Sequence, residues 1–479
     1  MLWIERFSAE HCLPLRTDPF NPGEAFAKAV FGPDVCWDRD EVVARAAQYL
    51  QNAVGAQPGV VERIGLCATL AARGCGKSFI VDRLCRLHGA HYSSGALILG
   101  NDLEARLVPV CISFQGLESD RAASAKCKLF NRLVHRAFFA ASTSFEAFLG
   151  FLGATTLERL TASVLFKAIV LYFQRLSVPA PIILLAVDEI IKCGAAQAHE
   201  ILDVCKSYLN NHPHAIRLLV TTFDDHLLLD GAGFQSPDAV RLASVQRRDA
   251  MGSQRPVTWL ALKPLQLANP RGVLRTLRPP VELSDEQLDY LVAMSGGHPR
   301  SLALLFDQLK SQSDRRPLLD IMQDWANELA TFVAHVPDAV IEECLARSVL
   351  GEEVHPTDIL ATMSVQDLVQ ATVLINAMDP QLAFVPQLSL LRLGHWAKTG
   401  TAAAPLKALV RRLLTLGSDL QHRSFEQFHA LFEQLRCWAW HQRGRQASTT
   451  LKEWFPHAVL VQGPKLPITV PNPLSFFYT

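Results

Sequence analysis

The chain of 479 residues is long enough for two or three domains and a large buried core. Apolar residues make up 49% of it and charged residues 19%, and no apolar run approaches the roughly 20 residues that cross a bilayer. Basic and acidic residues number 46 each, so the formal net charge is zero, which excludes an overall field that would draw the protein onto nucleic acid or an acidic membrane.

The N-terminal extension, residues 1–55, carries charge at Glu5 and Arg6, too early for a signal peptide. Its first part contains several prolines and predicts a loop with turns. A helix is expected to follow from Asp38 or Asp40, because aspartate is a good N-cap.

Short apolar runs alternate with helical patterns over residues 56–266. Buried strands of a parallel sheet read as such runs, because helices cover both faces of the sheet. We therefore predict an α/β domain with a mostly parallel sheet sandwiched by helices. The predicted strands are 64–70, 108–114, 182–187, 216–222 and 257–262, and helical patterns cover 77–88, 120–177 and the residues from 188 to 210.

Helical patterns dominate the rest of the chain, for example over 284–294 and 299–310. We expect a helical lid over 267–345 and a further, mostly helical C-terminal domain over 346–479. In the latter, Ser424-Phe-Glu-Gln has the sequence of a capping box and predicts a helix start.

A basic and aromatic cluster follows that predicted helix start. Such a mixture occurs in nucleic-acid sites, but a solvated helix end is the alternative interpretation. We find no spacing of acids and lysine that fits a metal-dependent nuclease. The cluster consists of Arg436, Trp438, Trp440, His441, Arg443 and Arg445.

The residues between the first predicted strand and the next helix read Ala71-Ala-Arg-Gly-Cys-Gly-Lys-Ser78. A triphosphate needs backbone N–H groups that close around it, a helix N-terminus aimed at it, and a cation for its outer charges. Glycines let the backbone approach, the lysine reaches the β- and γ-phosphates, and the serine hydroxyl is a Mg²⁺ ligand. The predicted phosphate contacts are Gly74, Cys75, Gly76, Lys77, Ser78 and Phe79, with Ser78 also on the metal.

The motif departs from the pattern G-x-x-x-x-G-K-[ST] at its first position, where Ala71 stands. A chance Gly-Lys-Ser helix start is the alternative interpretation. Alanine changes the turn but removes no phosphate ligand, so we expect the motif to bind a nucleoside triphosphate, ATP with Mg²⁺.

Two adjacent carboxylates, Asp188 and Glu189, follow the apolar strand 182–187. The carboxyl ends of strands are where open α/β sheets place their ligands. Asp188 would hold Mg²⁺ through water, and Glu189 would orient or deprotonate the attacking water, which makes Glu189 and Lys77 the predicted catalytic residues. A simple N-cap for the next helix is the alternative.

Thr221 and Thr222 end the next predicted strand. A polar side chain at that place can contact the γ-phosphate or its water, and we assign Thr222 to the nucleotide. The alternative is that threonine ends the strand because threonine suits strands.

Four features in this order resemble the STAND and AAA+ branch of P-loop ATPases. They are the phosphate-loop motif, Val187-Asp-Glu, Val220-Thr-Thr, and Met294-Ser-Gly-Gly-His-Pro-Arg300 at a helix start. The resemblance implies that His298, Pro299 and Arg300 touch the base or the phosphates. Taken without the family, Gly-Gly-His-Pro is a turn followed by proline at the first helical position.

The same resemblance implies two further nucleotide contacts. Arg39 would border the adenine pocket, since the family carries an arginine before the first strand. Arg247 or Arg248 would be an arginine finger, with a solvated pair as the alternative.

Within this branch the chain resembles the Crinkler effectors and the retrotransposon hot spot proteins in three segments. These are the strand 108–114, the long insertion before Asp188, and the helix 424–436. Such proteins join the ATPase to other domains, and many act in or near the nucleus.

Two functions are compatible with these features. The first is a Mg²⁺-dependent ATPase switch, in which ATP binding clamps the lid onto the sheet domain and hydrolysis releases it. The second is a non-hydrolysing scaffold whose C-terminal region binds a protein or nucleic-acid partner, and either could form a homo-oligomer. The eleven cysteines include no Cys-x-x-Cys pair, which favours reduced thiols in an intracellular protein, cytoplasmic or nuclear, without membrane association.

Overall fold

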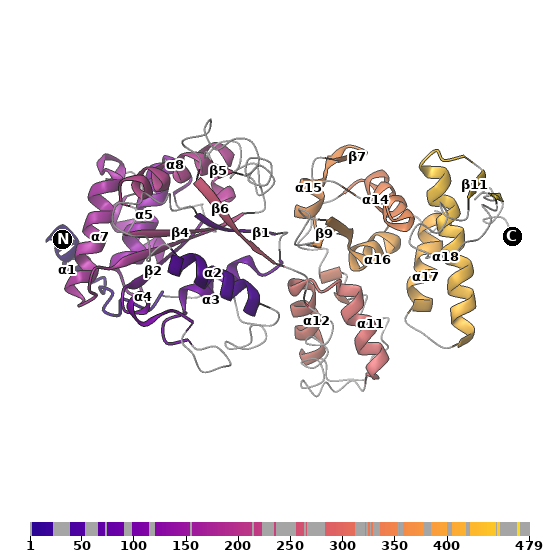
Figure 1. Ribbon diagram of the computed structural model, residues 1–479, viewed down its shortest axis with the longest axis horizontal. Helices are drawn as coiled ribbons and strands as arrows, with labels where there is room; N and C mark the ends of the chain where they lie inside the picture. The colour runs from indigo at the N-terminus through magenta and orange to yellow at the C-terminus, as the bar shows by residue number, and fades with distance from the viewer. Residues whose placement is uncertain are drawn as a thin grey trace. The chain divides into compact units, whose positions relative to one another are not determined.

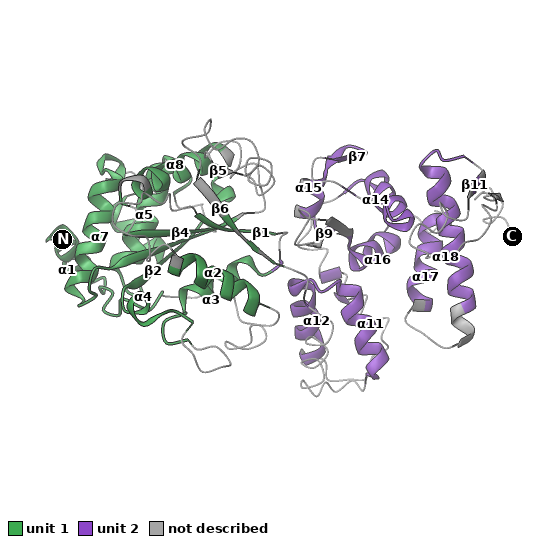
Figure 2. Cartoon of the chain, in the orientation of Figure 1, with its two compact units in different colours: residues 1–71, 76–262 green, residues 72–75, 263–479 purple. Residues whose placement is uncertain are grey.

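The computed structural model divides the chain into two compact units (Figure 2). Unit 1 comprises residues 1–71 and 76–262, and unit 2 comprises residues 72–75 and 263–479. None of the helices in the described part of the chain has the length and apolar character that a bilayer-spanning segment needs. The structure describes residues 2–22, 39–52, 66–71, 74–90, 98–114, 120–153, 156–212, 215–222, 234–235, 255–262, 265, 283–311, 321, 324–325, 327–328, 336–352, 354, 358–377, 385–399, 405–417, 422–446, 448–450 and 467–469.

Unit 1 is built on a parallel sheet with the strand order β2-β3-β4-β1-β6-β5. The prediction of an α/β fold with a parallel sheet is confirmed, and the predicted strands match the observed ones to within two residues where these are described. The strands are β1 (Leu66–Leu70), β2 (Leu107–Ser113), β3 (Ile182–Asp188), β4 (Ile216–Thr222), β5 (Phe234–Gln235) and β6 (Arg255–Ala261).

Helices cover both faces of this sheet (Figure 1). On one face lie α2 (Asp40–Asn52) and α3 (Lys77–Cys85), and on the other lie α5 (Ala125–Phe138), α7 (Ala162–Arg175) and α8 (Ala195–Asn211). Side chains alternate along a strand, so every second residue of β2, β3 and β4 joins the core under α5, α7 and α8. The remaining elements of unit 1 are α1 (Leu2–His11), α4 (Asn101–Glu104), α6 (Phe145–Leu152), the 3-10 helix η2 (Thr156–Arg159) and the 3-10 helix η3 (Ile190–Cys193).

The loop predicted for the first residues is wrong over α1. This helix is held by contacts with residues that are distant in sequence, because the Phe7 ring packs edge-on against Phe139 and Phe148. Ile4 and Phe7 are the only buried residues of α1. Two apolar positions within one helical turn do not make the repeating pattern from which a helix is predicted.

Unit 2 is mostly helical, with short strands that the sequence pattern did not indicate. The helix prediction at Ser424 is wrong in its start, because α18 begins at His422 and Ser424 lies inside it. A complete capping box instead opens α11 at Ser284, with Gln287 as its partner. The helices are α11 (Asp285–Ser295), α12 (Pro299–Ser311), α14 (Asp338–Leu350), α15 (Val365–Gln370), α16 (Leu390–Lys398), α17 (Pro405–Gly417) and α18 (His422–Gln442).

In the described part of unit 2, three antiparallel strand pairs accompany these helices. Strands of two to four residues give no usable alternation, which explains why the sequence pattern did not show them. They are β7 (Ile359–Leu360) with β8 (Met363–Ser364), β9 (Leu374–Ala377) with β10 (Val385–Leu388), and β11 (Ser448–Thr450) with β12 (Pro467–Thr469).

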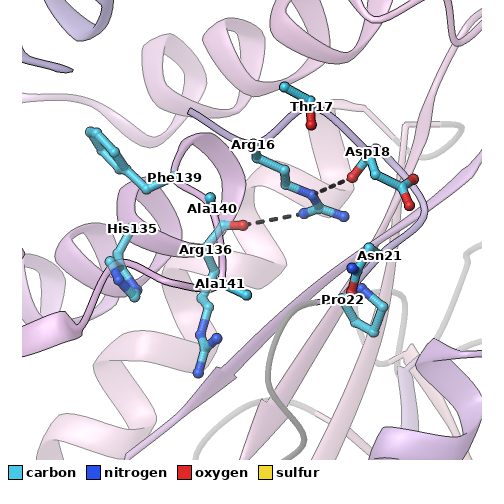
Figure 3. A pocket seen from close by; sticks show the side chains of 10 residues that line it. All are labelled: Arg16, Thr17, Asp18, Asn21, Pro22, His135, Arg136, Phe139, Ala140 and Ala141. Atoms are coloured by element: carbon cyan, nitrogen blue, oxygen red, sulfur yellow. Dashed lines mark hydrogen bonds between the residues drawn. The ribbon is translucent and has the colours of Figure 1, made fainter. Parts of the chain in front are cut away.

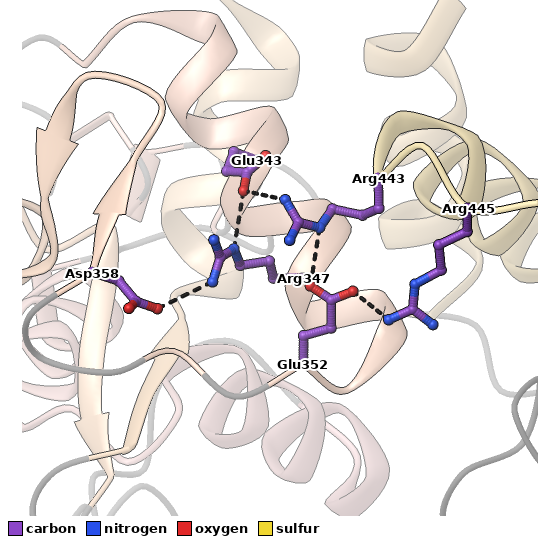
Figure 4. Close-up of polar contacts among 6 residues, drawn as sticks. All are labelled: Glu343, Arg347, Glu352, Asp358, Arg443 and Arg445. Carbon is purple, nitrogen blue, oxygen red and sulfur yellow. Dashed lines mark hydrogen bonds and ion pairs between the residues drawn. The ribbon is translucent and has the colours of Figure 1, made fainter.

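Six charged side chains tie α14 and the residues beside it to the end of α18 (Figure 4). Arg443 bonds to both Glu343 and Glu352, and Arg445 bonds to Glu352. Arg347 bonds to Glu343 at 2.9 Å and to Asp358 at 3.1 Å. We name this set the α14–α18 ion cluster; because its arginines face carboxylates, it favours the structural interpretation of the basic and aromatic residues here over a nucleic-acid site.

Candidate functional site

The phosphate-loop motif turns through two glycines with left-handed backbone. Gly74 has φ +83° and Gly76 has φ +90°, conformations that favour glycine, and Gly76 is the N-cap of α3. Ala71 is described and does not have a positive φ, so the first position of the motif does not demand glycine. The alanine at position 71 therefore introduces no backbone strain at that position.

Gly74 belongs to unit 2, where it packs against the start of α12. A Cβ on Gly74 would lie 2.8 Å from the Cβ of Arg300 and 2.8 Å from the ring of His298. The Arg300 N–H donates to the Gly74 carbonyl over 3.0 Å, and the His298 ring accepts from or donates to Ser301 Oγ at 2.8 Å. Only glycine fits at position 74.

Lys77 opens α3 and is nearly buried, with 8% of its surface exposed. Its Nζ donates to the Ala71 carbonyl over 2.7 Å, across the turn of the motif. The ammonium group is thus held at the carboxyl end of β1, where Ala71 follows the last strand residue.

Asp188, the last residue of β3, is fully buried and accepts two hydroxyl hydrogen bonds. Ser78 Oγ donates to its Oδ2 over 2.8 Å, and Thr221 Oγ1 donates to its Oδ1 over 2.6 Å. We name Ser78, Asp188 and Thr221 the carboxyl-end cluster. Within the described residues no lysine or arginine forms an ion pair with Asp188.

Burial raises the pKa of the Asp188 carboxyl above its usual range. The hydrogen bonds from Thr221 and Ser78 oppose that rise, the charge on Glu189 adds to it, and Lys77 opposes it. The carboxylate therefore carries a charge that the surrounding hydroxyl groups compensate only in part.

The register of the sheet extends the cluster into a row of polar side chains. Ser113 of β2 pairs with Asp188, and Thr69 of β1 pairs with Thr221. Residues paired in a parallel sheet point to the same face, and the bond from Ser78 shows that this is the α3 face. The Thr69 hydroxyl is buried and has no hydrogen-bond partner among the described residues.

Glu189 follows Asp188 with a left-handed backbone, φ 50° and ψ 40°. Its N–H donates to Thr221 Oγ1 over 2.9 Å, so the Thr221 hydroxyl bonds to Asp188 and to Glu189 at the same time. The Glu189 carboxylate forms an ion pair with Lys192 in η3.

The structure brings together Lys77, Ser78, Asp188 and Glu189, which were selected from two distant segments of the sequence. Sequence reasoning missed Lys192, although its spacing of three residues from Glu189 was a signal. It assigned Thr222 to the nucleotide, and the structure shows that the hydroxyl of the neighbouring Thr221 bonds to Asp188.

The other predicted contacts are distributed as follows. Phe79 is half-buried in the first turn of α3, Cys75 is buried in the motif, and Pro299 is the first residue of α12. Thr222 ends β4, but its side chain is outside the described residues, as are Arg247 and Arg248. Arg39 is buried just before α2, where its carbonyl accepts the Val43 N–H.

A separate cavity of about 100 Å³ lies between the N-terminal segment and the end of α5 (Figure 3). Arg16 lines it, but its five N–H groups all donate to backbone carbonyls, those of Asp18, Pro19, Pro109 and Arg136. Burial lowers the pKa of Arg16 to about 10 and that of His135, also in the lining, to about 4. We interpret Arg16 as a structural residue.

Comparison with known proteins returns structures rather than sequences. No family model matches the chain, and no curated protein matches it. The chain is similar to the Walker-type ATPase of Pyrococcus abyssi (13% identity, TM-score 0.45, covering 79% of this chain and 100% of the other). It is also similar to Cdc6p of Pyrobaculum aerophilum (13% identity, TM-score 0.36, covering 81% and 98%). The resemblance to Crinkler effectors and retrotransposon hot spot proteins stays a prediction.

Proposed function

We propose that this chain binds ATP with Mg²⁺ at the phosphate-loop motif and hydrolyses it. The observation that carries the proposal is the 2.8 Å hydrogen bond from Ser78 Oγ to Asp188 Oδ2. It joins the first turn of α3 to the end of β3 across 110 positions of sequence. A phosphate-binding turn and a buried acid therefore share one edge of a parallel sheet, which is where such sheets bind ligands.

The side chains at this edge fit a magnesium ion. Mg²⁺ prefers carboxylate and hydroxyl oxygens and keeps several of its waters. Ser78 Oγ and, through water, Asp188 would hold it, and among the described residues no cation forms an ion pair with the buried Asp188 carboxylate. Once bound, the ion would neutralise charge on the β- and γ-phosphates.

The phosphates themselves would lie against the turn of the motif. N–H groups at a helix N-terminus favour negative charge, and α3 begins directly after Gly76. Lys77 would exchange the Ala71 carbonyl for the phosphate oxygens, and Glu189 would orient the attacking water. The proposed nucleotide contacts are Gly74, Cys75, Gly76, Lys77, Ser78, Phe79, Thr222 and Pro299.

The test uses the full chain, two test variants and one control variant. Lys77→Ala should abolish ATP binding, because it removes the ammonium group at the start of α3, whereas Lys167→Ala on the exposed side of α7 is the matched control. Glu189→Gln should bind ATP and fail to release phosphate. Equal turnover by the wild-type chain and Glu189→Gln would contradict the hydrolytic part of the proposal.

A second candidate function is a scaffold that binds ATP without turnover. The observation in its favour is the ion pair between Glu189 and Lys192, which occupies the proposed base. Tight ATP binding without any phosphate release by purified protein would favour the scaffold.

We also propose that ATP binding is communicated to unit 2. Residues 72–75 belong to that unit, and Gly74 packs on His298 and Arg300 at the start of α12. Phosphates bound by the motif would act directly on this packing. A change in the hydrogen exchange of α12 on addition of Mg-ATP is the expected result, and its absence would contradict the switch.

A further inference from the structure

The Glu189 carboxylate is held by a residue of its own turn. Lys192 lies three residues on, in η3, and forms an ion pair with Glu189 Oε2. That oxygen has no exposure to solvent, although the side chains of Glu189 and Lys192 are 23% and 45% exposed. Lys192 therefore covers one oxygen of the acid that the proposed function requires.

The backbone conformation of the turn fixes the position from which the Glu189 side chain extends. Glu189 is left-handed, a conformation that is costly for a residue with a side chain and that is concentrated at functional sites. The Glu189 N–H donates to Thr221 Oγ1 over 2.9 Å, and the Glu189 carbonyl accepts the Lys192 N–H at 3.0 Å. Glu189 and Lys192 are thus joined through backbone and side chain alike.

We propose that Lys192 is a positioning residue that withholds Glu189 from the attacking water, an inference that rests on the proposed function and extends it to regulation. A general base must present a carboxylate oxygen within hydrogen-bond reach of the water, and the oxygen beneath Lys192 cannot. The two side chains are partly exposed and only three residues apart in sequence, and ion pairs of this kind are weak. Lys192 consequently slows turnover without abolishing it.

Steady-state turnover of Mg-ATP by full-length variants tests this proposal. Lys192→Met should raise kcat about two- to fivefold, which is the range expected for losing an ion pair of this exposure. KM should stay unchanged, because Lys192 contacts the base and, among the described side chains, none of the proposed phosphate ligands. A residue that mattered for folding alone would not separate kcat from KM in this way.

Three controls sharpen the measurement. Lys192→Arg keeps the charge and the donor, so its kcat should stay near that of the wild type. Lys167→Met removes an exposed lysine of α7 and should change nothing. In a Glu189→Gln background, Lys192→Met should not raise kcat, since no carboxylate is left that Lys192 could restrain.

An unchanged or lower kcat for Lys192→Met overturns the proposal, and so does a gain that persists in the Glu189→Gln background. ATP binding is measured separately, by titration with a fluorescent ATP analogue. Absence of binding by the wild-type chain overturns the proposed function and this inference together. Binding without turnover in both the wild type and Lys192→Met overturns this inference and leaves ATP binding in place.

Discussion

The carboxyl-end cluster of unit 1 and the α14–α18 ion cluster of unit 2 use charge in different ways. In the ion cluster, Glu343, Glu352 and Asp358 each face at least one arginine. In the carboxyl-end cluster, Asp188 is more deeply buried and receives only hydroxyl hydrogen bonds from described residues. The comparison separates acids that carry their own counter-charge from Asp188, whose charge, as we propose, is left for a ligand.

The largest expected effect comes from removing the charge of Asp188. Asp188→Asn keeps the size of the side chain but loses the negative charge that a metal would share, so Mg-ATP turnover should fall at least about 100-fold. The free energy of unfolding without nucleotide should not fall, because the variant removes a poorly compensated buried charge. Turnover and denaturant unfolding of the same preparation check both statements. Retained turnover would contradict the proposed role of Asp188 as the metal-binding acid.

Removing the Thr221 hydroxyl should have an intermediate effect. Thr221→Val deletes the bonds to Asp188 and to the Glu189 N–H together, so we expect turnover to fall about tenfold and the chain to lose about 1–3 kcal/mol of stability. Thr221→Ser retains the hydroxyl and serves as the control. A valine variant as active as the serine variant would show that the hydroxyl does not position either acid.

The pH dependence of metal binding should follow the raised pKa of Asp188. Over the range between the ordinary aspartate value and the raised one, the native chain keeps a proton that the unfolded chain has lost. The protonated Asp188 carboxyl therefore adds to the free energy of unfolding below that range, and this stabilisation is lost as the pH rises through it. Metal binding runs the opposite way, because it needs the ionised carboxylate.

Thermal unfolding with and without Mg-ATP measures this relation. The stabilisation by Mg-ATP should weaken on acidification already above the pH at which an ordinary aspartate is protonated. Asp188→Asn should lack this component. A stabilisation that is constant across the acidic range would contradict the assignment of Asp188 to the metal.

The smallest effect is expected in unit 2. Glu352→Gln weakens the pairs with Arg443 and Arg445, which are partly exposed, so we expect a loss of about 1 kcal/mol in stability and no change in turnover. Salt should reduce the difference between variant and wild type, because the charges are near solvent. A large loss of turnover would show that the ion cluster contributes to the site after all.

Much of unit 1 could be predicted from the sequence, because its strands are continuous apolar runs. Ile182–Asp188 is buried along its whole length, and a run of that kind followed by two acids has few other interpretations. The meeting of Ser78 with Asp188 also follows from the parallel sheet, since α3 follows the carboxyl end of β1 and Asp188 is the carboxyl end of β3.

Other features depend on tertiary contacts that no local pattern encodes. The helix around Phe7 forms against rings more than 130 positions away, and the Thr221 hydroxyl turns to Asp188 because the register places the two side by side. The start of α18 lies two residues before Ser424, so the capping sequence there did not locate the first residue of the helix.

Three of the five Arg16 bonds reach the carbonyls of Pro109 and Arg136, so the N-terminal segment is an integral part of unit 1. A recombinant fragment that began at the predicted helix after Asp38 would strip donors from the carbonyls of Pro109 and Arg136 and uncover the Phe139 and Phe148 rings. Unsatisfied carbonyls beside bare aromatic rings favour aggregation. The N-terminus should therefore not be trimmed into α1, whose Ile4 and Phe7 are buried, if unit 1 is to be produced in folded form.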